Sequence, residues 1–211
     1  MFVNHPTIGL IFMTIGAHVK LALILFCTLM TPAFAGESTM ATVFKMLASQ
    51  PRSDVSFVEK KHSGFLDDSI ELKGILRYLP PDTIIREQHS PKPLRFEITG
   101  NIVNMQRNGK KTRIKLDTIP TLNMFVNSFR AILLGDIVKL ESYYKIDFSG
   151  TEASWSMTLQ PISIKLSLLL ENIKFSGSQG VIETIEIREN EEDWSEMHLT
   201  PISASNGHEK N

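Results

Sequence analysis

The chain has 211 residues, of which 42% are hydrophobic and 21% are charged, and its formal net charge is −1 at pH 7. This length is enough for one well-buried domain and short for two. The near-neutral charge gives no electrostatic footprint for nucleic acid, so we expect no nucleic-acid partner. The single cysteine, Cys27, excludes an internal disulfide and a metal site built from several cysteines.

The first 35 residues are predicted to be a cleavable secretory signal peptide. Lys20 precedes the apolar run Leu21–Met30, and the A-x-A sequence Ala33–Ala35 follows it. This order of charge, apolar segment and small residues is typical of secretory signals. Cleavage after Ala35 places residues 36–211 outside the cytoplasm. Cys27 leaves with the signal, so we expect a mature chain without a thiol.

Alternatives to this interpretation concern the same segment. Translation starting at Met13 instead of Met1 also gives a signal of ordinary length. A membrane anchor over Thr7–Met30 would bury Lys20, and neither apolar run alone reaches the roughly 18 to 20 residues that a span needs. Lipidation of Cys27 is disfavoured because large apolar residues precede it.

Two segments show the period of an amphipathic helix. In Met40–Leu47 the apolar residues recur at i, i+3, i+4 and i+7, and Pro51 lies beyond the segment as a stop. Thr121–Leu134 has one face that is almost wholly apolar, and Gly135 follows as a natural helix end. Ile164–Leu170 fits either a strand or a short helical link.

Most of the remaining chain follows the two-residue period of half-buried strands. In Ser69–Tyr78 the even-numbered residues are apolar or glycine and share one face. Asn108 and Gly109 can both take the positive φ of a type I′ turn, which predicts a hairpin. Further strands are predicted at Thr83–Glu87, Leu94–Thr99, Ile102–Arg107, Lys110–Leu116, Tyr144–Phe148, Ala153–Gln160, Ile173–Ser176, Val181–Arg188 and Trp194–Leu199.

These elements predict a mainly β fold with some α structure. About ten antiparallel strands with one apolar face each, and only two amphipathic helices, favour a curved sheet that forms an incomplete, half β-barrel. The helices are expected to pack as a lid over an apolar cavity on the concave side. No linker divides residues 36–200, so we expect one domain there, followed by a polar, disordered tail at 201–211.

Four segments carry motifs that point to a known family. Phe57–Lys61 resembles an F-x-Q-K first strand, and Lys73–Asp82 resembles a G-x-L-x-x-x-R-P-N strand and turn. Trp155–Pro161 resembles a later strand that ends in L-x-P, and Phe175–Ile187 resembles a hairpin with the pattern I-x-x-I-x-I. In this order and spacing, the motifs resemble those of the bacterial outer-membrane lipoprotein carrier (LolA) family over Val55–Leu199.

The resemblance implies a periplasmic carrier. Such a protein binds the acyl chains of a lipoprotein or lipid in an apolar cavity and transfers its cargo towards the outer membrane without catalysis. It implies a monomer with an inner-membrane donor and an outer-membrane acceptor as partners, and no cofactor. The alternative is a periplasmic sensor or interaction module of the same fold, whose groove recognises a lipid or a protein segment.

One departure from the family pattern concerns the turn after the second strand. The family's carrier has an arginine before the proline of this turn, thought to hold the empty cavity shut, and this chain has Pro80 there. Arg77 lies three residues earlier and cannot be assumed to replace it. The resemblance therefore supports a lipid-binding cavity better than it supports the lipoprotein relay itself.

The lipid-binding cavity is expected between the apolar faces of the second helix and the strands, with ordinary core packing as the alternative. The lid residues are Leu122, Phe125, Val126, Phe129 and Leu133. The floor residues are Ile70, Leu72, Leu76, Leu94, Phe96, Ile98, Trp155, Met157 and Leu159. Each methylene that an acyl chain buries there is worth about 0.8 kcal/mol, so binding requires no specific polar contact.

No catalytic or metal-binding constellation is recognisable. The histidines of the domain, His62, His89 and His198, lack the H-x-x-x-H spacing of a helical zinc site. Glu189–Asp193 lacks the glycine-containing pattern of a calcium loop and is predicted as a polar turn. We therefore expect no enzyme activity, no metal and no cofactor, and a hydrolase acting on acyl chains is the least favoured function.

Basic residues cluster on the predicted hairpin around Asn108 and Gly109. A solvated outer face is the favoured interpretation, because antiparallel strands normally present a polar side to water. Contact with anionic headgroups or an acidic partner is the alternative. The residues are Arg107, Lys110, Lys111, Arg113 and Lys115.

Overall fold

The computed structural model describes residues 39–49, 53–65 and 68–202. The chain divides into the units 1–36 and 37–211, and every described residue belongs to the second unit. The expected signal peptide and residues 203–211 of the expected tail lie outside the described residues. None of the helices that are described is long and apolar enough to cross a membrane.

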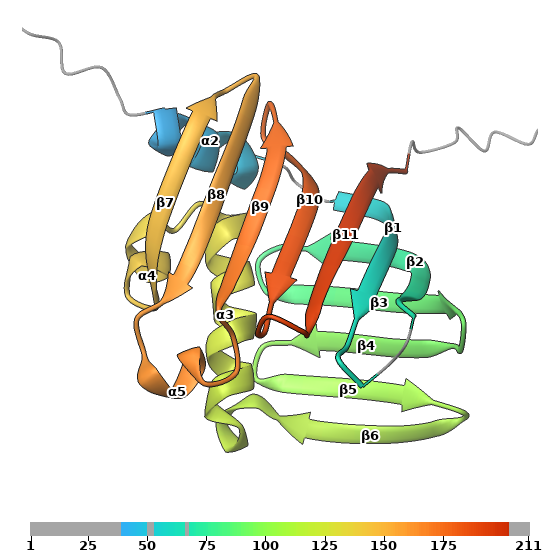
Figure 1. The fold of residues 1–211 in the computed structure, drawn as a ribbon. Helices are drawn as coiled ribbons and strands as arrows, with labels where there is room; N and C mark the ends of the chain where they lie inside the picture. The colour runs from blue at the N-terminus through green and yellow to red at the C-terminus, as the bar shows by residue number, and fades with distance from the viewer. Residues whose placement is uncertain (1–38, 50–52, 66–67, 203–211) are drawn as a thin grey trace, which may run out of the picture. The chain divides into compact units, whose positions relative to one another are not determined.

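One antiparallel sheet of eleven strands forms most of the unit (Figure 1). Its spatial order is β6-β5-β4-β3-β2-β1-β11-β10-β9-β8-β7, so two meanders, β1 to β6 and β7 to β11, are joined where β1 pairs with β11. The strands are β1 (Ser53–His62), β2 (Ile70–Leu79), β3 (Thr83–Ser90), β4 (Leu94–Thr99), β5 (Ile102–Arg107), β6 (Lys110–Lys115), β7 (Tyr144–Thr151), β8 (Ser154–Pro161), β9 (Asn172–Ser178), β10 (Val181–Arg188) and β11 (Trp194–Pro201).

The helices lie before the sheet and between its two meanders. Both predicted helices are present, as α2 (Thr39–Ala48) and α3 (Pro120–Leu134). Pro120 stands in the first turn of α3, where a missing N–H costs nothing. Gly135 ends α3 in the left-handed conformation, with φ of 70°, and its N–H donates to carbonyls of the last turn.

Two short helices complete the connections. Ile164–Leu170, which fits either a strand or a helical link by pattern, contains the short helix α5 (Ile164–Ser167). The helix α4 (Ile137–Glu141) was not predicted, because its five residues bury only Leu140 and leave no periodic signal. Asp136 caps it by accepting a hydrogen bond from the N–H of Lys139 at 2.9 Å.

The predicted hairpin is confirmed at Asn108 and Gly109. These residues have φ of 49° and 77°, and Arg107 pairs with Lys110 across the turn, as a two-residue hairpin requires. Two predicted strands ended too early. The prediction ended them at Phe148 and Ser176, whereas β7 continues through Gly150 to Thr151 and β9 continues through Gly177 to Ser178.

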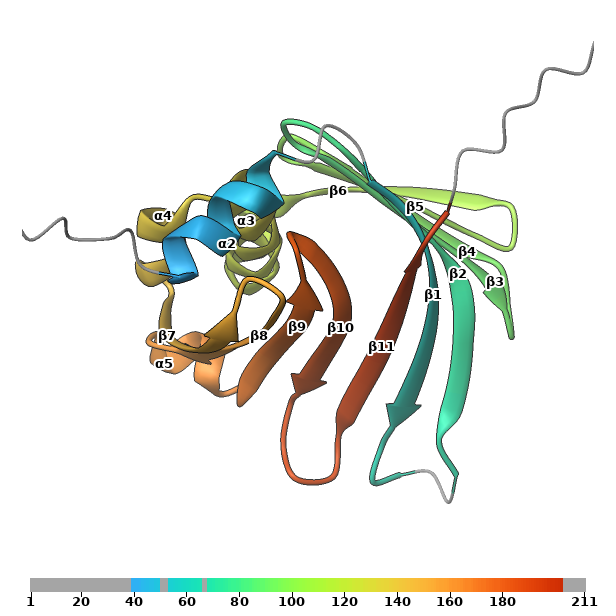
Figure 2. The same ribbon diagram turned by 90° about the horizontal axis from the view of Figure 1, so that it is seen from above.

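The fold class is confirmed as mainly β, with an open, curved antiparallel sheet. In Figure 2 the two ends of the sheet, β6 and β7, lie on either side of α3. Helix α3 also contacts both halves of the sheet through side chains. Its residues Ala131 and Ile132 belong to the larger hydrophobic core with β7 to β11, whereas Val126 packs with Val103 and Leu116 in a smaller core.

Candidate functional site

The strand register places all the predicted floor residues on one face of the sheet. Directly paired residues in antiparallel strands point to the same side. Leu76 of β2 pairs with Arg86 of β3, which in turn pairs with Phe96 of β4. On its other side Leu76 pairs with Val55 of β1, the strand that joins the first meander to the last strands. This face, which we call the inner face, is the side on which α3 and the hydrophobic cores lie.

Burial divides the inner face into a closed part and a more open part. The residues predicted on β8, namely Trp155, Met157 and Leu159, are at most 3% exposed and lie in the larger core. The other residues predicted on β2 and β4 are half-buried, whereas Ile70, the first residue of β2, is 40% exposed. Apolar side chains that are partly accessible on the inner face therefore lie over β2 and β4.

The predicted lid residues of α3 pack against both halves of the sheet. Phe125 and Phe129 are half-buried, their ring centroids lie 4.9 Å apart, and Phe129 meets the buried Phe175 edge-on at 5.5 Å. Leu122 and Val126 face the smaller core with Phe96 and Ile98 of β4. Leu133 is half-buried and, of this set, is the residue that belongs to neither core.

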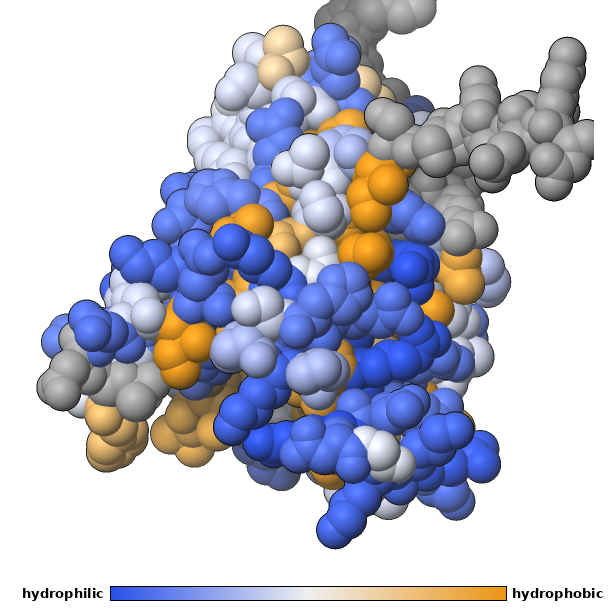
Figure 3. Space-filling model, turned by 90° about the vertical axis from the view of Figure 1, so that its right-hand side faces the viewer, coloured by the Kyte–Doolittle hydropathy of each residue, from blue (hydrophilic) through white to orange (hydrophobic). Residues whose placement is uncertain are grey.

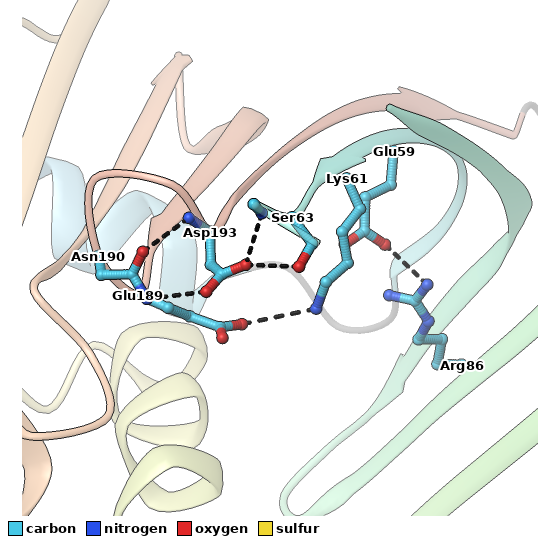
Figure 4. Close-up of polar contacts among 8 residues, drawn as sticks. Glu59, Lys61, Ser63, Arg86, Glu189, Asn190 and Asp193 are labelled. Atoms are coloured by element: carbon cyan, nitrogen blue, oxygen red, sulfur yellow. Dashed lines mark hydrogen bonds and ion pairs between the residues drawn. The ribbon is translucent and has the colours of Figure 1, made fainter. Parts of the chain in front are cut away.

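A buried ion pair interrupts the apolar inner face. Glu59 of β1 is 6% exposed, and its Oε2 accepts a hydrogen bond from Nη2 of Arg86 on β3 at 2.7 Å (Figure 4). The same Nη2 lies 3.4 Å from Oε1 of Gln88. The Arg86 guanidinium also lies over the Phe57 ring, 4.5 Å from its centroid, in a cation–π arrangement. We call Glu59, Arg86 and Gln88 the inner polar cluster.

Gly74 makes the geometry of this cluster possible. It lies on β2 between the two charged strands, paired with Phe57 on one side. A Cβ at Gly74 would approach Cε1 of Phe57 to 2.7 Å and would also collide with the backbone carbonyl of Glu87. Because position 74 has no side chain, the Phe57 ring covers β2 there and Arg86 reaches across to Glu59.

Glu59 and Arg86 were not predicted as site residues, although the pattern of alternation contains a signal for them. Glu59 lies two residues after the inward-pointing Phe57 and therefore points inward as well. Arg86 likewise lies two residues after the inward-pointing Ile84. A charged residue at an inward position of a half-buried strand is unusual, because burying a charge requires a partner. Because only β2 lies between β1 and β3, two inward charges of opposite sign on these strands indicate an ion pair.

Arg130 of α3 fixes the helix to two turns of the sheet. Its Nε and Nη2 donate to the carbonyl of Asp82 at 3.1 and 2.7 Å, and Nη2 also donates to the carbonyl of Gly100 at 2.8 Å. Burial lowers the pKa of Arg130, and the nearby Asp82 carboxylate opposes this effect. The turns between β2 and β3 and between β4 and β5 are therefore both tied to the helix.

Arg77, unlike Arg130, does not attach the helix to the sheet. Its side chain lies on the outer face, where it forms ion pairs with Glu87 at 2.9 Å and with Asp54 at 3.7 Å. Arg95 contacts the same Glu87 and also pairs with Glu97 at 2.6 Å. The outer face of β2 to β4 thus carries a network of charges, in contrast to the apolar inner face.

The outer face also carries three of the five basic side chains of the hairpin, whereas Arg107 pairs with the inward-pointing Leu94 and therefore lies on the inner face together with Lys110. Lys111, Arg113 and Lys115 pair in register with outward residues of β5 and are exposed. With Arg95 and Glu97 of β4, Lys111 and Arg113 border a shallow hollow of about 400 Å³. Figure 3 shows this side of the molecule as largely hydrophilic, with hydrophobic side chains in small separate patches and almost none at the bottom, where the hairpin lies.

Two buried polar atoms in the larger core lack a hydrogen-bond partner among the described residues. They are the hydroxyl of Tyr144 and Nε1 of Trp155. Burial raises the pKa of Tyr144. An unsatisfied buried donor costs on the order of 1–3 kcal/mol, so a hydrogen-bonding atom that reached either group would gain free energy.

The acidic segment after β10 forms a polar turn. Asp193 accepts hydrogen bonds from the Ser63 hydroxyl at 2.6 Å, from the Gly64 N–H at 3.3 Å and from the Asn190 amide at 2.8 Å (Figure 4). These bonds lower the pKa of the Asp193 carboxyl. Within the part of the chain that is described, no group of three or more potential ligands could hold a metal ion.

Comparison with known proteins identifies a family and several structures of low similarity. The family profile described as "Outer membrane lipoprotein carrier protein LolA-like" matches residues 34–206. No curated protein matches the sequence significantly. Similar solved structures include LprF from Mycobacterium bovis, with 10% identity, a TM-score of 0.38, and 79% of this chain and 96% of that chain covered. LppX from Mycobacterium tuberculosis has 8% identity, a TM-score of 0.39 and coverage of 79% and 97%. A LolA superfamily protein from Nitrosomonas europaea has 9% identity, a TM-score of 0.39 and coverage of 78% and 92%.

Proposed function

Because this chain belongs to the family of LolA-like outer membrane lipoprotein carriers, we propose that it binds the acyl chains of a lipoprotein or lipid and carries them towards the outer membrane. The proposed site is the open part of the inner face, over β2 to β4 and beneath α3. The observation that supports it best is the half-exposure of the apolar side chains there, which a core that packs only against itself would cover.

The chemistry of this surface suits an alkyl chain. Leu72, Leu76, Leu94, Phe96 and Ile98 offer aliphatic and aromatic contact on neighbouring strands. Each methylene that leaves water gains about 0.8 kcal/mol, so burial of eight methylenes is worth about 6 kcal/mol before the costs of ordering. Such binding needs no covalent step, which agrees with a carrier that does not catalyse a reaction.

Helix α3 is proposed as the lid of this site. It connects β6 to β7 by way of α4, and it contributes Phe125 and Phe129 towards the sheet. A lid must be held in place in the empty protein, and the contacts of Arg130 with the turns at Asp82 and Gly100 supply such an attachment. In this proposal the helix swings away from the strands when an acyl chain enters.

The proposed setting of this activity is the periplasm, reached through the signal peptide and its cut after Ala35. We propose that the protein works as a monomer that receives cargo from a donor in the inner membrane and releases it to an acceptor in the outer membrane. The near-neutral charge of the chain agrees with a soluble shuttle that does not adhere to nucleic acid.

Charged substitutions on the two sides of the site test the proposal. Phe125→Asp on α3 and Leu94→Asp on β4 each put a carboxylate where the alkyl chain would lie, and Leu94 belongs to neither core. Displacing two or more methylenes weakens binding of a fluorescent fatty acid by at least about tenfold. Binding is measured by fluorescence titration, and circular dichroism reports whether the strands persist.

Asn123→Asp is the matched control on the same helix. Asn123 lies opposite the apolar face, and its Oδ1 accepts a hydrogen bond from Asn127 at 2.9 Å, which a carboxylate preserves. The control therefore adds the same charge without occupying the site, and it should bind the fatty acid as the unmodified protein does. Unchanged binding by folded Leu94→Asp protein would remove β4 from the site and contradict the proposal.

A further inference from the structure

The inner polar cluster lies within the open part of the inner face. On β1, Glu59 pairs directly with the half-buried Leu72, and on β3, Arg86 pairs with the half-buried Leu76 and Phe96. Apolar side chains proposed to hold an acyl chain therefore adjoin the guanidinium on both sides along the sheet. An alkyl chain on these residues places its polar end within reach of Arg86.

The geometry leaves part of Arg86 free. A guanidinium has five N–H donors in a fixed plane. Only Nη2 of Arg86 has partners among the described residues, Glu59 and Gln88. The side chain is 23% exposed, so Nε and Nη1 remain available to an incoming acceptor. These two groups point to different sides of the guanidinium, so each can donate one charge-assisted hydrogen bond to an oxygen of a carboxylate or phosphate.

The surroundings of Arg86 hold it ready for a ligand. The guanidinium lies over the Phe57 ring. Glu59 fixes one corner of the guanidinium through the ion pair that Figure 4 shows. A side chain already held in one orientation loses little conformational entropy on binding. The arrangement is also costly for stability alone, since apolar residues of similar volume often replace a buried ion pair without loss.

We propose that Arg86 is a head-group site, which binds an anionic carboxylate or phosphate at the polar end of the acyl cargo while Glu59 positions the guanidinium and moderates its charge. This inference rests on the proposed carrier function and adds the substrate class, an acyl lipid with an anionic head. Glu59 limits the affinity, because its own carboxylate repels the incoming anion. Release to an acceptor requires such a limit.

The two partners of the ion pair therefore have opposite effects on binding. Arg86→Gln removes the donor and should weaken binding of oleate by about tenfold or more, as expected for hydrogen bonds to a charged group. Glu59→Gln keeps the shape of the side chain, removes the repulsion and should strengthen binding of oleate. A purely structural ion pair would give effects of the same sign, because both substitutions break it equally.

The experiment measures the affinities of oleate and oleyl alcohol by competition against a fluorescent acyl probe. Acetate, which has the carboxylate but no long alkyl chain, is measured in the same way. The unmodified protein should prefer oleate over the alcohol, Arg86→Gln should lose this preference, and Glu59→Gln should enlarge it. The double variant Glu59→Gln with Arg86→Gln removes both charges of the pair, so neither position keeps an unpaired charge. It keeps the test valid if Arg86→Gln alone fails to fold, and it should bind both ligands equally.

The outcomes separate the inference from the function on which it rests. Equal affinity for oleate and oleyl alcohol in the unmodified protein, with both bound, overturns the head-group site and leaves the carrier function standing. Binding of neither ligand by folded protein overturns both. Binding of acetate that depends on Arg86 shows a site for small anions and also overturns the assignment to a lipid head.

Discussion

Gly74 shows how one residue determines the inner face. Without a side chain at this position, the Phe57 ring lies over β2 and Arg86 reaches Glu59 across it. The glycine was predictable as an inward position of the second strand, but its consequence was not. A pattern of alternation indicates which side a residue faces, whereas it does not indicate which side chain fills the space that a glycine leaves.

The Asp193 carboxyl group is predicted to make the stability of the protein depend on pH. Its pKa is lowered below the ordinary value of 3.8 by the hydrogen bonds from Ser63, Asn190 and Gly64. A carboxyl with a depressed pKa in the folded state contributes stability above its unfolded pKa, and loses it as pH falls through the folded value. The contribution of Asp193 is therefore complete above about pH 4 and disappears below it.

The variant Asp193→Asn tests this linkage. Urea unfolding of both proteins from pH 7 to pH 2.5 should give a stability difference that is constant down to about pH 4 and shrinks at lower pH, because only the unmodified protein then gains a proton. A difference that stays constant across the whole range would show that the hydrogen bonds do not depend on the charge of Asp193.

The elements follow from the sequence where their periodic pattern is long. Helices α2 and α3 and the hairpin at Asn108 and Gly109 were predicted within one or two residues. Short elements carry too few residues for a period, so α4 was missed and α5 stayed ambiguous. The lid residues of α3 were predicted as one set, but the structure distributes four of them between two cores and leaves Leu133 in neither. This distribution depends on the curvature of the sheet and not on the helix.

Arg130 is the residue on which the attachment of α3 is predicted to depend. Arg130→Met removes three hydrogen bonds from a charged donor to the carbonyls of Asp82 and Gly100. We expect a loss of about 1.5–3 kcal/mol in the free energy of unfolding. Amide hydrogen exchange should become faster in α3 than in the strands, because the helix then opens separately.

Arg77→Met is the control for this experiment. It removes an arginine of the outer face whose ion pairs with Glu87 and Asp54 are partly exposed to solvent. Exposed ion pairs contribute at most about 1 kcal/mol. If both substitutions cost the same stability and leave exchange in α3 unchanged, Arg130 does not anchor the helix.

At the scale of the whole unit, the sequence predicted a curved, open sheet with helices on its concave side. The number of strands, about ten, is close to the eleven observed. The predicted floor residues share one face of the sheet, and the division of that face into a packed part at β8 and a half-exposed part at β2 and β4 emerged only from the structure. Burial depends on which elements lie opposite, and sequence periodicity contains no information on that.

The central claim is that the inner face holds an acyl lipid, and native mass spectrometry of the intact protein tests it most directly. Protein purified under gentle conditions from cells that express the full 211-residue chain should carry an added mass equal to that of an acyl lipid. Collisional activation should release the lipid for identification, and the Leu94→Asp variant should carry less of it. A spectrum with only the mass of the bare chain, before and after incubation with oleate, would contradict the account.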